Sequence, residues 1–315
     1  MKAFIFLPDT RISAGLGHLS RCIKFSEFIK SANFVLVRKE MKLNFLNKNV
    51  KKKIIKYTNL KSTLNNLKKK YQNINLIIDT YNKRTMSFDF KKYSSNQIFI
   101  LDYKIKNNFQ HILDHTFKRN SKFFSFLRKK QKVNYGLLNF PIKKRIIEKK
   151  KQKILIDYGT VRNKNAINSA LSFIEKIPKL NNYKIVVINK FFKKSMIYCS
   201  AVKKRTSVIN YTNQIEELYS KSLFSFGSCG ISLYEKSFYR LPTIAICSSF
   251  NQKYNFSNFK KYNCILDYKT IKKYTLNSRN NDKLFEDLHL IKKNLIRYFN
   301  TSKNKKNLYQ YFTKF

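Results

Sequence analysis

The 315-residue sequence has no tryptophan, only six glycines and four prolines, and few acidic residues. Its 17 Asp and Glu stand against 66 Lys and Arg, so the formal net charge is +49. A charge of this size suits binding to nucleic acid or to an anionic membrane surface. It also has a compositional explanation, because abundant Lys, Asn, Ile, Phe and Tyr beside scarce Gly is typical of a coding sequence poor in G and C. We favour the compositional explanation, since the lysines are spread along the whole chain and no usual nucleic-acid-binding motif occurs.

The five cysteines are scattered and form no C-x-x-C pair. They are Cys22, Cys199, Cys229, Cys247 and Cys264. This spacing argues against a zinc site and a disulfide framework, and it fits a reducing cytosol. No stretch approaches the roughly 18 apolar residues of a membrane span. The first residues predict a strand followed by Pro8 and Asp9, not a signal peptide. We therefore expect a cytoplasmic protein.

Apolar runs alternate with helical patterns in both halves of the chain, which predicts two parallel-sheet α/β domains. The predicted strands are residues 3–7, 34–37, 54–55, 75–79 and 97–102, then 153–157, 184–188, 207–209, 223–226 and 241–246. Pro141 and the charge run 143–151 mark the boundary between the halves. We expect an N-terminal domain at 1–148, a C-terminal domain at 149–300 and a basic tail at 301–315.

The first predicted strand leads into a turn with Gly15 and Gly17 and then into a helix. In open α/β sheets, ligands bind at such turns, and the backbone N–H groups at the helix start suit an anion. His18 stands in the first turn of that helix. The positive helix end disfavours imidazolium, so a neutral imidazole there can accept a proton as a general base. The alternative is a capping or surface histidine with no chemical role.

Two further predicted strands end in acids. Residues 75–79 end at Asp79, with Tyr81 close behind, and residues 97–102 end at Asp102. Because the carboxyl ends of parallel strands share one edge of the sheet, we expect Asp79, Tyr81 and Asp102 to gather near His18. The alternative is that each acid caps the loop that follows its strand.

A second strand, glycine turn and helix occur at residues 226–235. Backbone and hydroxyl groups of Gly227, Ser228 and Gly230 offer donors to a phosphate. The carboxylate of Glu235 suits a ribose diol, and Asn251 with Gln252 suits the diphosphate or the sugar. There are alternatives for each: Ser232 and Glu235 have the spacing of a capping box, and residues 251–252 are common in turns.

Together these motifs resemble a known family. The run from Gly15 to Cys22, with Asp9 ahead of it, resembles the first motif of the UDP-sugar hydrolases of pseudaminic acid biosynthesis. Residues 230–235, Leu241-Pro242 and Asn251-Gln252 resemble the carboxyl-domain motif of that family. The glycosyltransferase that adds N-acetylglucosamine to the lipid-linked peptidoglycan precursor shares this second motif more loosely. The resemblance covers most of residues 1 to 268.

The resemblance implies a GT-B-like α/β architecture of two Rossmann-like parallel-sheet domains with an interdomain cleft. It implies hydrolysis of UDP-2,4-diacetamido-2,4,6-trideoxy-β-L-altrose without a metal or cofactor, with this substrate and water as the partners. Separately, we expect a monomer and no specific nucleic acid partner. His18 would activate the water, with Tyr81 and Asp9 as further catalytic residues. The implied substrate and UDP ligands are Gly15, Gly17, Arg21, Gly159, Gly227, Ser228, Gly230, Ile231, Glu235, Asn251 and Gln252.

The sequence departs from the family pattern at three places. Leu7 stands where the family has Arg, and Val161 stands where the family has Asp after its paired glycines. The region before the linker is reduced to Pro141-Ile-Lys143. The alternative is therefore a GT-B glycosyltransferase that moves a sugar from UDP to a glycan or lipid acceptor, for which weak attraction of the basic chain to a membrane surface is an asset. A third hypothesis is a non-catalytic protein that binds a sugar nucleotide or nucleic acid.

Overall fold

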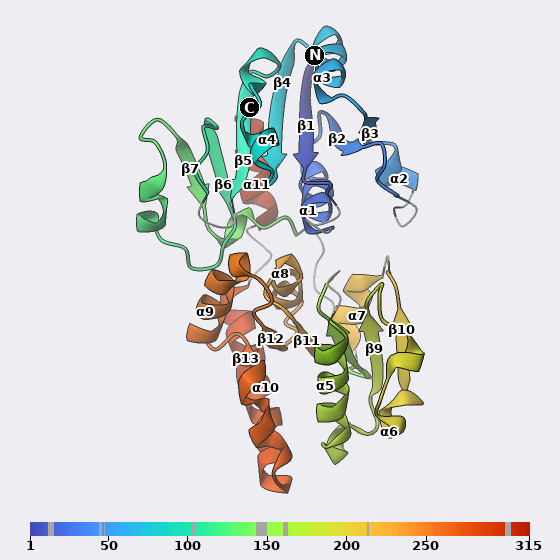
Figure 1. Cartoon of the computed structure of the whole chain (residues 1–315). Coiled ribbons are helices and arrows are strands. Elements are labelled where there is room, and N and C mark those ends of the chain that lie inside the picture. The colour runs from blue at the N-terminus through green and yellow to red at the C-terminus, as the bar shows by residue number, and fades with distance from the viewer. Residues whose placement is uncertain are drawn as a thin grey trace. The chain divides into compact units, whose positions relative to one another are not determined.

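The protein, seen here in a computed structural model, folds into two compact units (Figure 1). The structure describes residues 1–11, 16–43, 46, 48–101, 105–142, 150–159, 163–212, 214–299 and 304–315. The first unit comprises Met1–Lys143 and Thr301–Phe315, and the second comprises Lys144–Asn300. Each unit has its own parallel sheet and its own hydrophobic core.

The first unit contains a seven-stranded parallel sheet in the order β3-β2-β1-β4-β5-β6-β7. Its strands are β1 (Lys2–Pro8), β2 (Ala32–Arg38), β3 (Ile54–Tyr57), β4 (Asn73–Asp79), β5 (Asn96–Leu101), β6 (His111–Asp114) and β7 (Lys132–Tyr135). Its helices are α1 (Gly17–Ser26), α2 (Lys48–Lys51), α3 (Leu60–Lys70), α4 (Lys83–Met86) and α11 (Asn304–Thr313). The strand order reverses direction between β1 and β4, which makes this pair the topological switch point of the sheet.

Alternation along β1 divides the apolar side chains of the first unit between two faces. Ile5 and Leu7 pack with Leu64 and Leu67 of α3 on one face. The opposite face is covered by α1 and α11, so the last helix in sequence completes the core of the first unit. Residues 301–315, set apart as a basic tail in the sequence analysis, therefore include a packed helix. The dense lysines of this stretch obscure its apolar face, which consists of Leu308, Tyr311 and Phe312.

Shortening Phe312 is expected to loosen the first unit alone. Its ring meets the rings of Phe4 and Phe25 edge to face, each at a centroid distance of 6.0 Å. Phe312→Leu removes both aromatic contacts and should cost about 1–2 kcal/mol. Amide hydrogen exchange should quicken in β1 and stay unchanged in the second unit. Gln310→Ala, an exposed change on the same helix, is the control; equal protection of β1 in both variants would contradict the expectation.

The second unit contains a six-stranded parallel sheet in the order β10-β9-β8-β11-β12-β13. Its strands are β8 (Lys153–Asp157), β9 (Lys184–Ile188), β10 (Thr206–Ile209), β11 (Ser222–Ser228), β12 (Thr243–Ile246) and β13 (Leu266–Asp267). Its helices are α5 (Lys164–Glu175), α6 (Ser200–Lys203), α7 (Ile215–Lys221), α8 (Ile231–Phe238), α9 (Lys253–Lys261) and α10 (Ser278–Tyr298). Here the switch point lies between β8 and β11, because the chain builds outward from β8 and then returns to its other side.

The predicted strands are confirmed in both units, and so is the prediction of two parallel-sheet domains. Strands β6, β7 and β13 were not predicted, since each is short and lacks a continuous apolar run of useful length. The predicted strand 97–102 is β5, but Asp102 lies outside the described residues. Among the described residues, no helix is both long and apolar enough to cross a bilayer.

Candidate functional site

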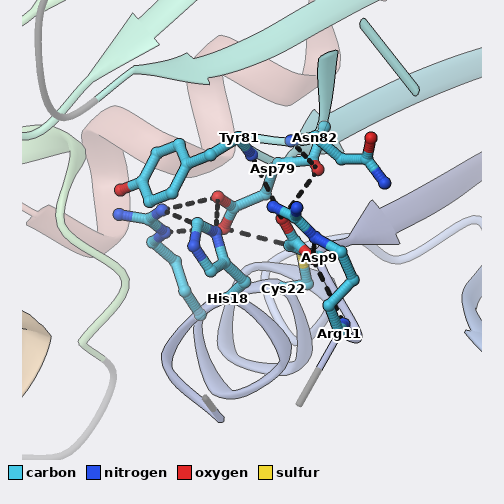
Figure 2. Close-up of polar contacts among 9 residues, drawn as sticks. Asp9, Arg11, His18, Cys22, Asp79, Tyr81 and Asn82 are labelled. Carbon is cyan, nitrogen blue, oxygen red and sulfur yellow. Dashed lines mark hydrogen bonds and ion pairs between the residues drawn. The ribbon is translucent and has the colours of Figure 1, made fainter. Parts of the chain in front are cut away.

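A buried cluster of His18, Asp79 and Arg21 lies at the switch point of the first unit. Figure 2 shows His18 and Asp79 of this cluster. His18 occupies the first turn of α1, and Asp79 is the last residue of β4. The Nδ1 atom of His18 lies 2.5 Å from Asp79 Oδ1. Arg21 donates from Nε to Asp79 Oδ2 at 2.7 Å and from a terminal nitrogen to Oδ1 at 2.5 Å. His18 and Arg21 are three residues apart on one helix, so both side chains reach the same carboxylate.

Electrostatics fix the charge of Asp79. Complete burial by itself would raise the pKa of this carboxyl, but the Arg21 guanidinium and the His18 ring more than offset that effect and hold the pKa well below its usual range. An ionised carboxylate only accepts hydrogen bonds, so Nδ1 of His18 is the nitrogen that carries the proton. In the neutral ring, Nε2 then holds the free lone pair, which is the tautomer that a general base requires.

Tyr81 and Asp9 complete the arrangement beside His18 (Figure 2). The Tyr81 ring meets the His18 ring edge to face at a centroid distance of 4.5 Å. Asp9, at the end of β1, accepts two side-chain hydrogen bonds from Arg11, one from the Thr80 hydroxyl and one from the Tyr81 backbone N–H. Burial raises the pKa of Asp9, and the Arg11 and Thr80 hydrogen bonds reverse this to a net lowering. The Asp9 carboxylate thus holds the segment that carries Tyr81.

The predicted gathering of strand-end residues around His18 is confirmed for Asp79 and Tyr81. Asp79 is no loop cap, because its carboxylate bonds to His18 and Arg21. Arg21, expected to touch substrate, is only 1% exposed, and its guanidinium lies against Asp79 inside the unit. Gly17 begins α1, whereas Gly15 lies outside the described residues. Asp79 was expected nearby, but its pairing with His18 and Arg21 was not predicted.

In the second unit, the predicted residues gather at the carboxyl ends of β8, β11 and β12. Gly227 and Ser228 end β11, Gly230 is the N-cap of α8, and Ile231 is its first helical residue. Gln252 joins two loops, because its Oε1 accepts hydrogen bonds from the Cys229 and Ser248 backbone N–H groups at 3.1 and 3.2 Å. Asn251 precedes it and accepts from the Ser249 hydroxyl at 2.6 Å. The start of α8 thus presents backbone N–H groups beside a braced loop, an arrangement that suits an anion.

Glu235 is 8% exposed and accepts a hydrogen bond from the Tyr219 hydroxyl at 3.2 Å. The capping-box alternative for Ser232 and Glu235 is wrong, because the helix starts earlier, with Gly230 as its N-cap. Gly159, just beyond the end of β8, has a φ of +77°, a conformation that favours glycine. Val161 lies outside the described residues.

Lys236, on α8, was not singled out from the sequence. Its ammonium is fully buried and lies 3.1 Å from both the carboxylate and the backbone oxygen of Asp157. A Cβ at Gly227 would lie 2.6 Å from that ammonium and 2.9 Å from the Asp157 backbone oxygen. Glycine at position 227 is therefore what leaves room for the buried lysine.

Gly227→Ala is accordingly expected to destabilise the second unit by about 1–3 kcal/mol through overpacking. Gly230→Ala is the matched control for stability, because its Cβ would meet only Gln252 Nε2, at an ordinary 3.6 Å. The melting temperatures of the two variants should differ by several degrees. Equal melting temperatures would show that Lys236 relaxes away without cost.

Neither site gathers an obvious set of metal ligands: in the described part of the chain, no three His, Cys, Asp or Glu side chains come together in a way that could hold an ion. Both sites instead combine a strand-end aspartate with a buried cation from a helix on the same unit. In the first unit the pair is Asp79 with Arg21, and in the second it is Asp157 with Lys236.

No family model and no curated relative matches this sequence. Solved structures match over almost the whole chain. UGT2 of Phytolacca americana, complexed with UDP-2-fluoro-glucose and pterostilbene, has 10% identity and a TM-score of 0.64, covering 100% of this chain and 99% of that one. UGT71G1 of Medicago truncatula, complexed with UDP-glucose, has 11% identity and a TM-score of 0.62, with 99% and 98% covered. MurG of Acinetobacter baumannii has 9% identity and a TM-score of 0.61, with 100% and 99% covered.

At such low identity these similarities establish the fold. The chain has the α/β fold of the GT-B glycosyltransferases, with two Rossmann-like parallel-sheet domains, as the sequence predicted.

Proposed function

We propose that this protein is a UDP-sugar-dependent glycosyltransferase in which His18 is the general base. The observation that carries the proposal is the buried imidazole of His18, oriented by Asp79 at the switch point of the first sheet. Ligands bind at switch points in open α/β sheets. The solved UGT2 and UGT71G1 structures, which share the fold, are complexes with UDP-sugars.

The second unit supplies the residues for the nucleotide. The N-terminus of α8, at Gly230 and Ile231, suits the diphosphate, since its backbone N–H groups and helix dipole favour negative charge. Glu235 would accept from the ribose hydroxyls, and Gln252 would hold the neighbouring loop in place. Gly159, Gly227 and Ser228 lie at the strand ends beside this helix. The open space around Gly159 would allow close approach of the ligand, whereas the space at Gly227 holds the Lys236 ammonium.

The chemistry follows from the tautomer of His18. As an acceptor hydroxyl attacks the anomeric carbon, Nε2 of His18 takes its proton, a new C–O bond forms, and the bond between the sugar and the diphosphate breaks. UDP leaves with the electron pair of that bond. The Asp79 carboxylate stabilises the imidazolium that results. Donors at the start of α8 stabilise the negative charge that develops on the diphosphate.

Hydrolysis of a UDP-sugar is the second candidate, with water in place of the acceptor hydroxyl. The motif from Gly15 to Cys22 favours it, because that motif resembles the hydrolases of pseudaminic acid biosynthesis. Its substrate would be UDP-2,4-diacetamido-2,4,6-trideoxy-β-L-altrose. The same base performs either reaction, so the geometry of His18 does not separate them.

The test is a panel of UDP-sugars that includes UDP-glucose, UDP-N-acetylglucosamine and the diacetamido altrose derivative. UDP release is measured without an acceptor and then with phenolic and saccharide acceptors. Release that depends on an acceptor supports the transferase, whereas stoichiometric free sugar without one supports the hydrolase. Failure of the wild-type protein to bind UDP in calorimetry would contradict both. Retention on a nucleic acid column at about 0.5 M salt would favour the binding-protein hypothesis instead.

A further inference from the structure

The second unit contains a buried cation that none of the predicted ligands accounts for. Lys236 lies on α8, whose first residue, Ile231, is partly exposed to solvent. The Lys236 side chain, in contrast, is 0% exposed. It donates to Asp157 Oδ2 and to the Asp157 backbone oxygen, each at 3.1 Å. A buried ammonium loses its hydration, and these two bonds replace only part of it. Burial of this ammonium therefore carries a desolvation cost, which its two bonds to Asp157 offset.

Asp157 contacts both Lys236 and the turn that follows β8. While Oδ2 faces the lysine, Oδ1 accepts a hydrogen bond from the Gly159 backbone N–H at 3.0 Å. Gly159 has a left-handed backbone, and its carbonyl accepts from Asn189 Nδ2 at 3.4 Å. One carboxylate therefore joins α8 to the turn that follows β8.

This connection lies at the switch point of the second sheet. Gly227 of β11 is the register partner of Asp157 of β8, and these are the two strands between which the order reverses. Because Gly227 has no side chain, the Lys236 ammonium lies close to the backbones of both β8 and β11. The two elements that Lys236 connects, the start of the β8 loop and helix α8, are the elements to which we assign the nucleotide.

We propose that Lys236 is a positioning residue for the nucleoside diphosphate, acting through Asp157 on the backbone at Gly159. This inference rests on the proposed function. Lys236 does not touch the nucleotide, since its ammonium is enclosed. It fixes the position of the turn after β8 relative to α8, so that the backbone groups of both elements can face the diphosphate. Its loss should weaken nucleotide binding and leave the proton transfer at His18 unchanged.

The experiment compares Lys236→Met with the double variant Lys236→Met/Asp157→Asn. The single change leaves Asp157 without its cation and is expected to lower the melting temperature. The double change removes both charges and should restore most of the stability, because no unpaired charge remains. Lys260→Met is the matched control, since Lys260 pairs with Asp267 at 2.8 Å on the surface of the same unit.

We expect the double variant to bind UDP about tenfold more weakly than wild type in calorimetry, with a matching rise in KM and kcat within about twofold. The Lys260→Met variant should bind as wild type does. A stable double variant with wild-type affinity would overturn the positioning role while leaving the proposed function intact. Wild-type protein that binds no UDP would overturn the proposed function and this inference with it.

Discussion

Replacing His18 by Asn is expected to lower kcat for UDP-sugar turnover about 10²–10⁴-fold, the usual contribution of a general base. Asn keeps a polar group close to Asp79 but offers no nitrogen that can take a proton from the acceptor. The affinity for UDP should stay unchanged, because the nucleotide ligands that we propose belong to the second unit. Stopped assays of UDP release, with calorimetric titration of UDP, measure the two quantities separately.

The matched control is His289→Asn, which changes an exposed histidine on α10. It should retain wild-type kcat. If His18→Asn keeps more than a tenth of wild-type kcat while UDP binding persists, His18 is not the base. A variant that loses UDP affinity and kcat together would instead indicate that the change disturbs the fold.

Asp79→Asn is expected to destabilise the protein by about 3–5 kcal/mol, because it leaves the Arg21 guanidinium buried without its counter-ion. It should also lower kcat about 10⁴-fold, since the Asn amide can donate to Nδ1 of His18 as well as accept from it and no longer fixes the tautomer. Urea denaturation followed by circular dichroism measures the free energy of unfolding. Asp89→Asn, an exposed aspartate in the same unit, is the control and should cost less than about 1 kcal/mol.

The stability contributed by Asp79 depends on pH with a definite sign. Its pKa is lower in the folded protein than the unfolded value near 3.9, because Arg21 and His18 outweigh the effect of burial. The contribution is therefore present in full above about pH 5 and is lost as the pH falls through the unfolded pKa towards the folded one. The difference in stability between wild type and Asp79→Asn should narrow below about pH 4. A difference that stays constant from pH 7 to pH 3 would contradict this account.

The sequence predicted that Asp79 and Tyr81 gather near His18, because the signals for this clustering are local. Asp79 ends a continuous apolar run, and strand ends of a parallel sheet meet at one edge. The spacing of His18 and Arg21 places both on one helix face. The sequence could not show that Arg21 and His18 bind the same Asp79 carboxylate. Arg21 was expected to face substrate, and only the packing of α1 against β4 turns it towards Asp79.

Lys236 and α11 were missed for a shared reason. In a chain with 66 Lys and Arg, a buried lysine resembles the many that face solvent. The signal for Lys236 was its position three residues after Leu233, which is fully buried on α8. For α11 it was the spacing of Leu308, Tyr311 and Phe312, which matches one face of a helix. In both helices, the many lysines make the helical spacing of the buried residues hard to recognise in the sequence.

Because α11 belongs to the first unit, the two units are expected to finish folding in a definite order during translation. The second unit is one continuous segment of chain, whereas the first is divided into two parts that flank it. During translation the second unit can fold as soon as it leaves the ribosome. The first unit is complete only once its final helix has been made, and until then Phe4 and Phe25 lack their contacts with Phe312. A fragment ending at residue 143 should therefore aggregate, and joining it through a short loop to α11 is the rational way to obtain the first unit alone.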